Sequence, residues 1–296
     1  MGEGGERFEM TRTKIGIIGG SGLYQIDGLT DVEWRRVESP FGTPSDELCC
    51  GRLGESDVVF LPRHGRGHRL SPSEINYRAN IDALKRVGVT DILSLSAVGG
   101  LQERYAPGTF VLVDQFIDRT FAREKSFFTD GCVAHVSMAR PVCSRLGDAL
   151  AAADASLLRG GTYLTMEGPQ FSTLAESELY RSWNCAVIGM TNMPEAKLAR
   201  EAEICYATIA MVTDYDCWHP GHDDVSVEMI IKVLEANAER ARGLIKAVVP
   251  ALGRHEGPCH AGCQRALEHA LITAPSARAP AALDRLSAVA GRVLGR

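Results

Sequence analysis

The chain lacks any long apolar run, and no stretch approaches the roughly 20 residues that a membrane-spanning helix needs. It also lacks an excess of positive charge, since the formal net charge is -5 at pH 7. We therefore expect no nucleic-acid partner and no membrane partner. Two glycine motifs are missing as well: the G-x-G-x-x-G of dinucleotide-binding folds and the G-x-S-x-G elbow of serine hydrolases.

Regularly spaced cysteines are also absent. The 9 cysteines show no repeated spacing, and several of them, such as Cys185 and Cys205, lie in apolar runs. We expect reduced thiols that fill the core, as is usual in the cytosol. Cys259, His260 and Cys263 lie close together, but no second C-x-x-C pair accompanies them. A structural zinc site is therefore the weaker interpretation, and we expect no metal and no organic cofactor.

Glycine and apolar residues are plentiful, and the 30 glycines and 45% hydrophobic content suit a compact enzyme with many tight turns. Apolar runs alternate with helical patterns along residues 14–252, which predicts a single α/β domain with a central, mixed but mostly parallel, twisted sheet flanked by helices. Residues 1–13 are polar and lack the apolar core of a signal peptide, so we expect a disordered leader and a cytoplasmic protein. Residues 253–296 change composition, and we expect a peripheral arm or one that packs on a neighbouring subunit.

The pattern also predicts the individual elements. Strands are expected at residues 14–19, 58–62, 92–97, 110–113, 161–166, 185–190 and 204–212. Helices are expected at residues 74–87, 140–155, 176–183, 195–202 and 225–249, the first of them capped by Ser73, with short helical pieces at residues 264–271 and 281–294.

Two carboxylates, Asp214 and Asp216, directly follow the apolar run 204–212. Side chains two residues apart at the end of a strand point the same way. Ligands of open α/β sheets sit at the C-terminal edge of the strands. One carboxylate that accepts and one that donates a proton suit a base with an exocyclic amine beside a ring nitrogen. Two solvated loop acids are the alternative that the motif alone leaves open.

Anion-binding groups follow other predicted strands. Ser21 lies in a glycine turn, Arg63 and His64 follow the next strand, and Ser96 and Thr191 lie at two further strand ends. Hydroxyls, turn N–H groups and a guanidinium fork suit phosphate, and a neutral imidazole can donate from one nitrogen. A structural turn explains the glycine run alone equally well. Taken together, one site that holds a phosphate and a base is the economical explanation.

Sequence motifs in the same regions carry a family resemblance. In chain order they are Gly19-Gly20-Ser21-Gly22-Leu23, Pro40-Phe41-Gly42, Arg63-His64-Gly65, Asn76-Tyr77-Arg78-Ala79-Asn80, Glu167-Gly168-Pro169-Gln170-Phe171-Ser172, Met190-Thr191, Pro194-Glu195 and Thr213-Asp214-Tyr215-Asp216-Cys217-Trp218. Over about residues 14–250 the chain resembles the S-methyl-5'-thioadenosine phosphorylases, in the trimeric class of the purine nucleoside phosphorylase superfamily. The resemblance implies the nucleoside phosphorylase fold and a homotrimer.

The resemblance also implies the roles of individual residues. The phosphate site would comprise Ser21, Arg63, His64, Ser96, Ala97 and Thr191. The nucleoside would contact Val98, Gly99, Phe171, Ile188, Met190, Asp214, Asp216, Val227 and Ile230, together with His135 from the neighbouring subunit.

Within that set, the resemblance makes Asp214 the general acid at N7 of the base and makes Asp216 the partner of its 6-amino group. Met190 would lie against the ribose, and Phe171 would stack near the base. The methylthio pocket would be lined by Val227 and Ile230. Ser172 and Val227 match positions that separate this family from inosine-cleaving relatives.

The reaction that the resemblance implies is phosphorolysis of methylthioadenosine, with phosphate as co-substrate, in purine and methionine salvage. Three alternatives remain open: a phosphorylase of methylthioinosine or of inosine and adenosine, a nucleosidase that uses water, and a non-catalytic nucleoside-binding protein. Two departures from the family pattern stand out. Gly189 replaces a common asparagine, which is expected to loosen the base contacts, and the tail beyond residue 253 matches poorly.

Overall fold

The structure is a computed structural model that describes residues 13–20, 23–221, 227–254 and 257–295. Within the long helix near the C-terminus, the side chains of residues 227–232 and 234–235 are also outside the description. Almost all of the predicted leader therefore lies outside the described residues. So do three predicted site residues: Ser21, and the side chains of Val227 and Ile230.

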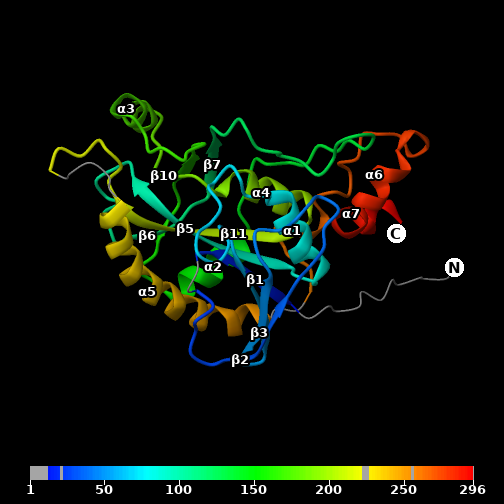
Figure 1. Ribbon diagram of the computed structural model, residues 1–296, viewed down its shortest axis with the longest axis horizontal. Helices are drawn as coiled ribbons and strands as arrows, with labels where there is room; N and C mark the ends of the chain where they lie inside the picture. Colours follow the sequence, from blue (N-terminus) through cyan, green and yellow to red (C-terminus); the bar gives the residue numbers. More distant parts are fainter. Residues whose placement is uncertain (1–12, 21–22, 222–226, 255–256, 296) are drawn as a thin grey trace.

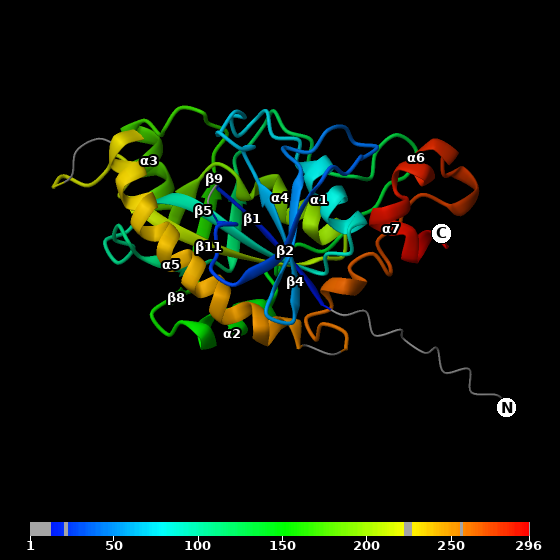
Figure 2. The same cartoon turned by 60° about the horizontal axis from the view of Figure 1, so that its bottom comes forward.

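A mixed sheet of 11 strands forms the centre of the molecule (Figures 1 and 2). Its main path runs β2-β3-β4-β1-β5-β10-β9-β7, while β11 pairs with β5 and β6, and β6 pairs with β8. The strands are β1 (Lys14–Gly19), β2 (Leu29–Arg35), β3 (Leu48–Leu53), β4 (Ser56–Pro62), β5 (Asp91–Gly100), β6 (Phe110–Leu112), β7 (Gln115–Asp118), β8 (Leu158–Arg159), β9 (Thr162–Thr165), β10 (Val187–Gly189) and β11 (Cys205–Asp214).

The central strands β4, β1, β5 and β11 are parallel to one another, and their residues are almost all buried. Strands covered on both faces need continuous apolar sequence, which is why their apolar runs predicted them correctly. Strands β2 and β3 add an antiparallel edge beside β4. The predicted fold class, a mostly parallel sheet in an α/β domain, is thus confirmed.

Helices cover both faces of the sheet (Figure 2). The helices are α1 (Tyr77–Arg86), α2 (Ser144–Ala153), α3 (Leu174–Ser182), α4 (Asn192–Glu201), α5 (Val227–Gly253), α6 (Pro280–Arg285) and α7 (Ser287–Leu294). One core joins α2 and α5 to residues such as Ile209 of β11, and the other joins α1, α4 and α7 to residues such as Tyr206. Successive side chains of β11 thus enter opposite cores, as strand alternation requires.

Several sequence-based boundaries were wrong for identifiable reasons. Helix α1 begins at Tyr77 rather than near residue 74, because the side chain of Asn76, not Ser73, accepts a hydrogen bond from the N–H of Ala79 (3.0 Å). Ser73 instead donates to the carboxylate of Glu167. Strand β2 was missed because its side chains are largely exposed, which leaves no apolar run in the sequence.

The described part of the C-terminal arm, residues 257–295, packs on its own chain (Figure 1). Leu267, Leu286 and Val289 are fully buried in the core formed by α1 and α4. The N–H of Leu267 and the guanidinium of Arg292 both bond to Glu203, just beyond α4. The arm therefore completes one face of the domain. No helix in the described ranges is both long and apolar enough to cross a membrane.

Candidate active site

The sheet branches at the C-terminal end of strand β5, where the candidate site lies. Gly99 pairs with Asp214 of β11 on one side and with Ile188 of β10 on the other. A Cβ atom at Gly99 would lie 2.9 Å from Asp214 Oδ1 and 3.2 Å from Asp216 Cβ. Only glycine leaves room for both acids, so the branch brings the predicted nucleoside residues Gly99, Ile188, Asp214 and Asp216 together, with Val98 buried beside them.

The two acids lie close together for a different reason from the one expected. Strand β11 continues to Asp214, but Asp216 has a φ of 54° and lies in a left-handed turn beyond the strand. The N–H of Asp216 donates to Asp214 Oδ1 (2.8 Å), an aspartate turn that folds the chain back on itself. Strand alternation therefore does not explain the pair, and the turn does.

Asp214 is a buried carboxyl whose charge is disfavoured. Burial raises its pKa to about 6, and the neighbouring Asp216 charge adds to that rise. The Thr213 hydroxyl, which donates to Asp214 Oδ2 (2.7 Å), and the N–H of Asp216 act in the opposite direction. The balance leaves a carboxyl that carries a proton in an appreciable fraction of molecules near neutral pH.

Asp216 carries a hydrogen-bond acceptor that the described residues leave without a donor. It is 7% exposed, and its Oδ2 accepts no hydrogen bond from the described residues. Burial raises its pKa, while the hydroxyls of Ser177 and Ser172 oppose that rise. A buried oxygen without a partner is costly, so it points to a ligand that brings a donor.

Two hydroxyls meet close to the acid pair. Ser96 Oγ of β5 lies 3.3 Å from Thr191 Oγ1 and 2.9 Å from the phenol oxygen of Tyr163, and both Ser96 and Thr191 are 5% exposed. Thr191 directly precedes α4, whose backbone is interrupted by a non-helical residue, Met193 (φ -117°, ψ 130°). With Ala97 adjacent on β5, the predicted Ser96-Ala97-Thr191 part of the phosphate site is brought together.

Arg63 is buried at 2% exposure and extensively bonded. Its Nε and Nη2 donate to the carboxylate of Glu195 (2.8 and 3.1 Å), and its Nη1 donates to the Leu95 carbonyl (2.8 Å). Burial lowers the pKa of Arg63, but Glu195 more than compensates, so the pKa is raised. The bidentate face that we expected to bind phosphate is therefore taken by Glu195. Arg63 instead joins β4, β5 and α4 and places a fixed positive charge behind the hydroxyls.

His64 follows Arg63 and stacks on His68, with ring centroids 4.2 Å apart. Its Nδ1 lies 2.8 Å from the carbonyl of Leu70, and burial lowers the pKa of the ring to about 4. A carbonyl only accepts, so the neutral ring carries its proton on Nδ1 and leaves Nε2 as an acceptor. A neutral His64 therefore cannot donate to an anion, contrary to the sequence-based expectation.

Some residues that build the site escaped the sequence analysis. Arg123, whose side chain is 1% exposed, pairs with Glu167 (3.0 Å) and donates to the carbonyls of Met190 (2.6 Å) and Met193 (2.8 Å). It thereby fixes the segment that carries Met190. Glu167 and Glu195 lie within the motifs quoted above. Asking which cations pair with these two acids would have pointed to Arg123 and Arg63.

The remaining predicted residues are placed less closely. Phe171 is 42% exposed at the rim, and the carbonyl of its neighbour Ser172 accepts from the Cys217 thiol (3.4 Å). His135 is exposed on the loop between β7 and α2, and its N–H donates to the Ala270 carbonyl (2.8 Å). The described part of the chain does not bring His135 to the acid pair.

Gly189 departs from the family pattern without leaving a gap. A Cβ at this position would overlap the phenol oxygen of Tyr163 and lie 3.1 Å from Val98 Cγ1. Tyr163 therefore fills the space that a larger residue would occupy, and its hydroxyl bonds to Ser96 (2.9 Å). The looser base contact that we expect from Gly189 stays a prediction.

Comparisons with known proteins agree with this geometry. The phosphorylase superfamily model matches residues 14–250. S-methyl-5'-thioadenosine phosphorylase of Cereibacter sphaeroides is 62% identical over 96% of this chain and 99% of its own, and that of Rhodospirillum rubrum is 64% identical over 95% and 97%. The crystal structure of a methylthioadenosine phosphorylase from an Antarctic soil metagenomic library superposes with a TM-score of 0.89 at 48% identity, covering 94% of this chain and 99% of that one. The chain therefore belongs to the phosphorylase superfamily and, within it, to the S-methyl-5'-thioadenosine phosphorylases, a family of pentosyltransferases.

Proposed function

We propose that this chain catalyses the phosphorolysis of S-methyl-5'-thioadenosine to adenine and 5-methylthioribose 1-phosphate. The observation that carries the proposal is the pair at the end of β11: a carboxyl on Asp214 whose pKa is raised to about 6, beside a buried acceptor on Asp216 that no described residue satisfies. The reactions named for the relatives support the choice of substrate. The setting would be purine and methionine salvage in the cytoplasm.

Asp214 would act on the leaving base. The C1'–N9 bond breaks with its electrons moving onto the purine, and the proton of Asp214 neutralises the purine at N7. Phosphate attacks C1' from the opposite face of the sugar and forms the new C–O bond. The sugar has oxocarbenium character in the transition state, and the phosphate charge stabilises it in a dry site. General acid catalysis of this kind accelerates a reaction by ~10² to 10⁴.

The phosphate would sit among Ser96, Ala97 and Thr191, and the resemblance adds Ser21, which lies outside the described residues. Because His64 offers a lone pair at Nε2, it would accept a hydrogen from a protonated phosphate oxygen rather than donate to an anion. Arg63 would stabilise the anion mainly through its fixed charge. No metal or organic cofactor enters this chemistry, and phosphate is the co-substrate.

Asp216 would select the base. Its ionised carboxylate accepts a hydrogen bond from a 6-amino group but faces the lone pairs of a 6-oxo group. A mismatch that leaves buried polar groups unpaired discriminates by ~10⁴ or more. Adenine nucleosides are therefore preferred over methylthioinosine and inosine. Apolar side chains at Val227 and Ile230 would favour a methylthio group over a hydroxyl by about 1 to 3 kcal/mol.

A homotrimer would complete the site with His135 of a neighbouring subunit. Two exposed apolar side chains face each other near His135: Val133 at 41% and Ile272 at 63% exposure, joined by a hydrogen bond from the N–H of Ile272 to the carbonyl of Val133. The two segments are joined by the bridge between Ala134 and Leu271. Exposed apolar groups around a predicted intersubunit contact support an interface there.

One assay tests the proposed function. Purified protein is incubated with methylthioadenosine, adenosine or methylthioinosine, with and without phosphate, and base release is followed by chromatography. We expect adenine release that requires phosphate and is fastest with methylthioadenosine. Equal release without phosphate would identify a nucleosidase, faster cleavage of methylthioinosine would identify a 6-oxopurine enzyme, and no release would leave only a binding protein.

A further inference from the structure

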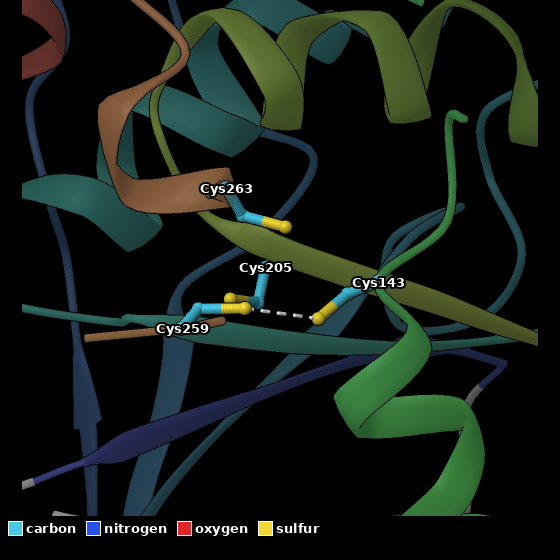
Figure 3. Close-up of side chains that lie close together, drawn as sticks. All are labelled: Cys143, Cys205, Cys259 and Cys263. Atoms are coloured by element: carbon cyan, nitrogen blue, oxygen red, sulfur yellow. Dashed lines mark hydrogen bonds between the residues drawn. The ribbon is translucent and has the colours of Figure 1, made fainter. Parts of the chain in front are cut away.

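Four buried thiols from three separate parts of the chain meet behind β11 (Figure 3). Cys143 precedes α2, Cys205 begins β11, and Cys259 and Cys263 come from the C-terminal arm. Figure 3 shows their sulfur atoms converging on a common point, and all four lie within 4.8 Å of one another. The proposed reaction uses none of them, so this cluster needs its own explanation.

The spacing of the sulfur atoms matches one small ion. Zinc binds thiolates at about 2.3 Å in a tetrahedron, which places the sulfurs about 3.8 Å apart. Here Cys143 Sγ and Cys259 Sγ are 3.5 Å apart, and the full set stays within 4.8 Å. A four-iron cluster would not fit between sulfurs this close. All four cysteines are free thiols, and 3.5 Å is far beyond the roughly 2.05 Å of a disulfide.

The surroundings of the cluster suit negative charge. Arg145 is 8% exposed, and its Nε and Nη1 have no hydrogen-bond partner among the described residues. Its Nη2 donates to the carboxylate of Asp91, and Arg145 follows the cluster residue Cys143 by two positions at the start of α2. Cys143 is also the N-cap of α2, where a helix favours an anion. A buried cation with unused donors is the complement of a tetrathiolate site.

The sequence concealed this arrangement. Of the four cysteines, only Cys259 and Cys263 are close in the sequence; together with His260 they suggested a weak site, and we therefore expected no metal. In the fold, His260 is exposed and lies beside Ser144 (3.4 Å between Nε2 and Oγ), away from the sulfurs. The missing ligands are Cys205, which reads as a core residue of a buried strand, and Cys143, which lies 116 residues before Cys259.

We propose that Cys143, Cys205, Cys259 and Cys263 bind one zinc ion as thiolates and that this ion is structural. Four protein ligands close the coordination sphere, so the ion would take no part in catalysis. The zinc ion would hold the C-terminal arm against β11 and the start of α2. Further along, the arm bonds to the loop that carries His135, through the bridge between Ala134 and Leu271. Loss of the ion would therefore loosen the segment that we expect at the subunit interface.

The wild-type protein provides the first test. The chain is purified without chelators, and its metal content is measured by inductively coupled plasma mass spectrometry. A mercurial reagent then releases the metal into a zinc-sensitive dye while the thiols are counted. We expect about one zinc ion per chain, released only when the thiols react. Protein that contains no zinc, or iron instead, would overturn the proposal, as would peptide mapping that finds Cys143 and Cys259 joined as a disulfide.

Substitutions test the ligands one at a time. Cys259→Ser and Cys263→Ser should lower the zinc content on the order of tenfold or more, because serine is a poor zinc ligand. Cys49→Ser and Cys132→Ser are matched controls, since these cysteines are equally buried outside the cluster, and both should retain the metal. Zinc retained in Cys259→Ser, or lost equally in the controls, would contradict the site. Metal content is independent of turnover, so this result stands apart from the proposed reaction.

Discussion

At the scale of single residues, two aspartates two positions apart have different environments. Both are buried, but hydrogen bonds from Thr213 and from the Asp216 N–H occupy both oxygens of Asp214, while Asp216 keeps an unused oxygen. Pairs of acids in unlike environments commonly divide the work of an active site. In the proposed reaction, Asp214 would donate the proton and Asp216 would recognise the base.

Replacement of Thr213 by valine tests the proton donor. The hydroxyl stabilises ionised Asp214, so Thr213→Val removes about 1 kcal/mol of that stabilisation and raises the carboxyl pKa further above 6. Since the acid form is the active one, activity falls as pH rises through this pKa. We expect the alkaline limb of kcat/KM to move to higher pH by about one unit.

Asp214→Asn is the control for this profile. This variant should lack the alkaline limb of the kcat/KM profile, and its kcat should be lower by ~10² to 10⁴, with a smaller change in KM. Near-normal turnover in Asp214→Asn would exclude the acid role. An alkaline limb that stays in place in Thr213→Val would show that another group titrates.

Replacement of Asp216 tests base selection. An asparagine at this position presents an N–H donor to a 6-oxo group in place of the unsatisfied carboxylate oxygen. We expect Asp216→Asn to shift the ratio of kcat/KM for methylthioinosine over methylthioadenosine upward by ~10² or more. Rates on both substrates measure it, and an unchanged ratio would exclude Asp216 as the selecting group.

At the scale of elements, helix α4 carries functional groups at both ends. Thr191 directly precedes it, while Glu201 ends it at 6% exposure and accepts from the N–H of Phe127 (2.7 Å) and the hydroxyl of Ser126 (2.8 Å). Burial nevertheless raises the pKa of Glu201 from 4.5 to about 7. A negative charge at the C-terminal end of a helix is also unfavourable. Ionisation of the Glu201 carboxyl therefore destabilises the folded protein.

This destabilisation predicts how the stability of the protein depends on pH. The folded-state pKa of Glu201 lies above the unfolded value, so its stabilising effect is complete below about pH 4.5 and is lost as pH rises toward about 7. The full difference is about 3 kcal/mol. Glu201→Gln should therefore unfold at higher temperature than wild type above pH 7, with the gap closing at low pH. Calorimetry across this range measures it, with the half-exposed Glu178→Gln as control, and a pH-independent gap would contradict the linkage.

The elements also show what the sequence can reveal. Continuous apolar runs predicted β1, β4, β5 and β11, because strands buried on both faces have no other composition. The strand-end groups Ser96, Thr191, Asp214 and Asp216 followed from the fold class. The branch of β5 at Gly99 and the left-handed turn at Asp216 did not, because both depend on contacts between distant segments. The Arg63–Glu195 pair and the thiol cluster were missed for the same reason, because each joins segments that are distant in the sequence.

At the scale of the whole molecule, the proposed interface around His135 is testable. Ile272→Glu places a charge on an exposed apolar position beside that loop, and burying it between subunits would cost several kcal/mol. We expect the variant to dissociate in analytical ultracentrifugation and to lose activity mainly through a higher KM for the nucleoside. Val32→Glu, at a similarly exposed position on β2, should stay assembled. Dissociation of both variants, or of neither, would argue against this interface.

Strand β5 contributes Ser96 to the proposed phosphate subsite and Gly99 to the proposed base subsite. Three residues of extended chain span about 10 Å, and a strand hydrogen-bonded on both edges hardly stretches. The backbone of β5 would therefore hold the two subsites at a fixed distance from each other. Side-chain changes would alter which base or which 5' substituent is accepted, but not that distance.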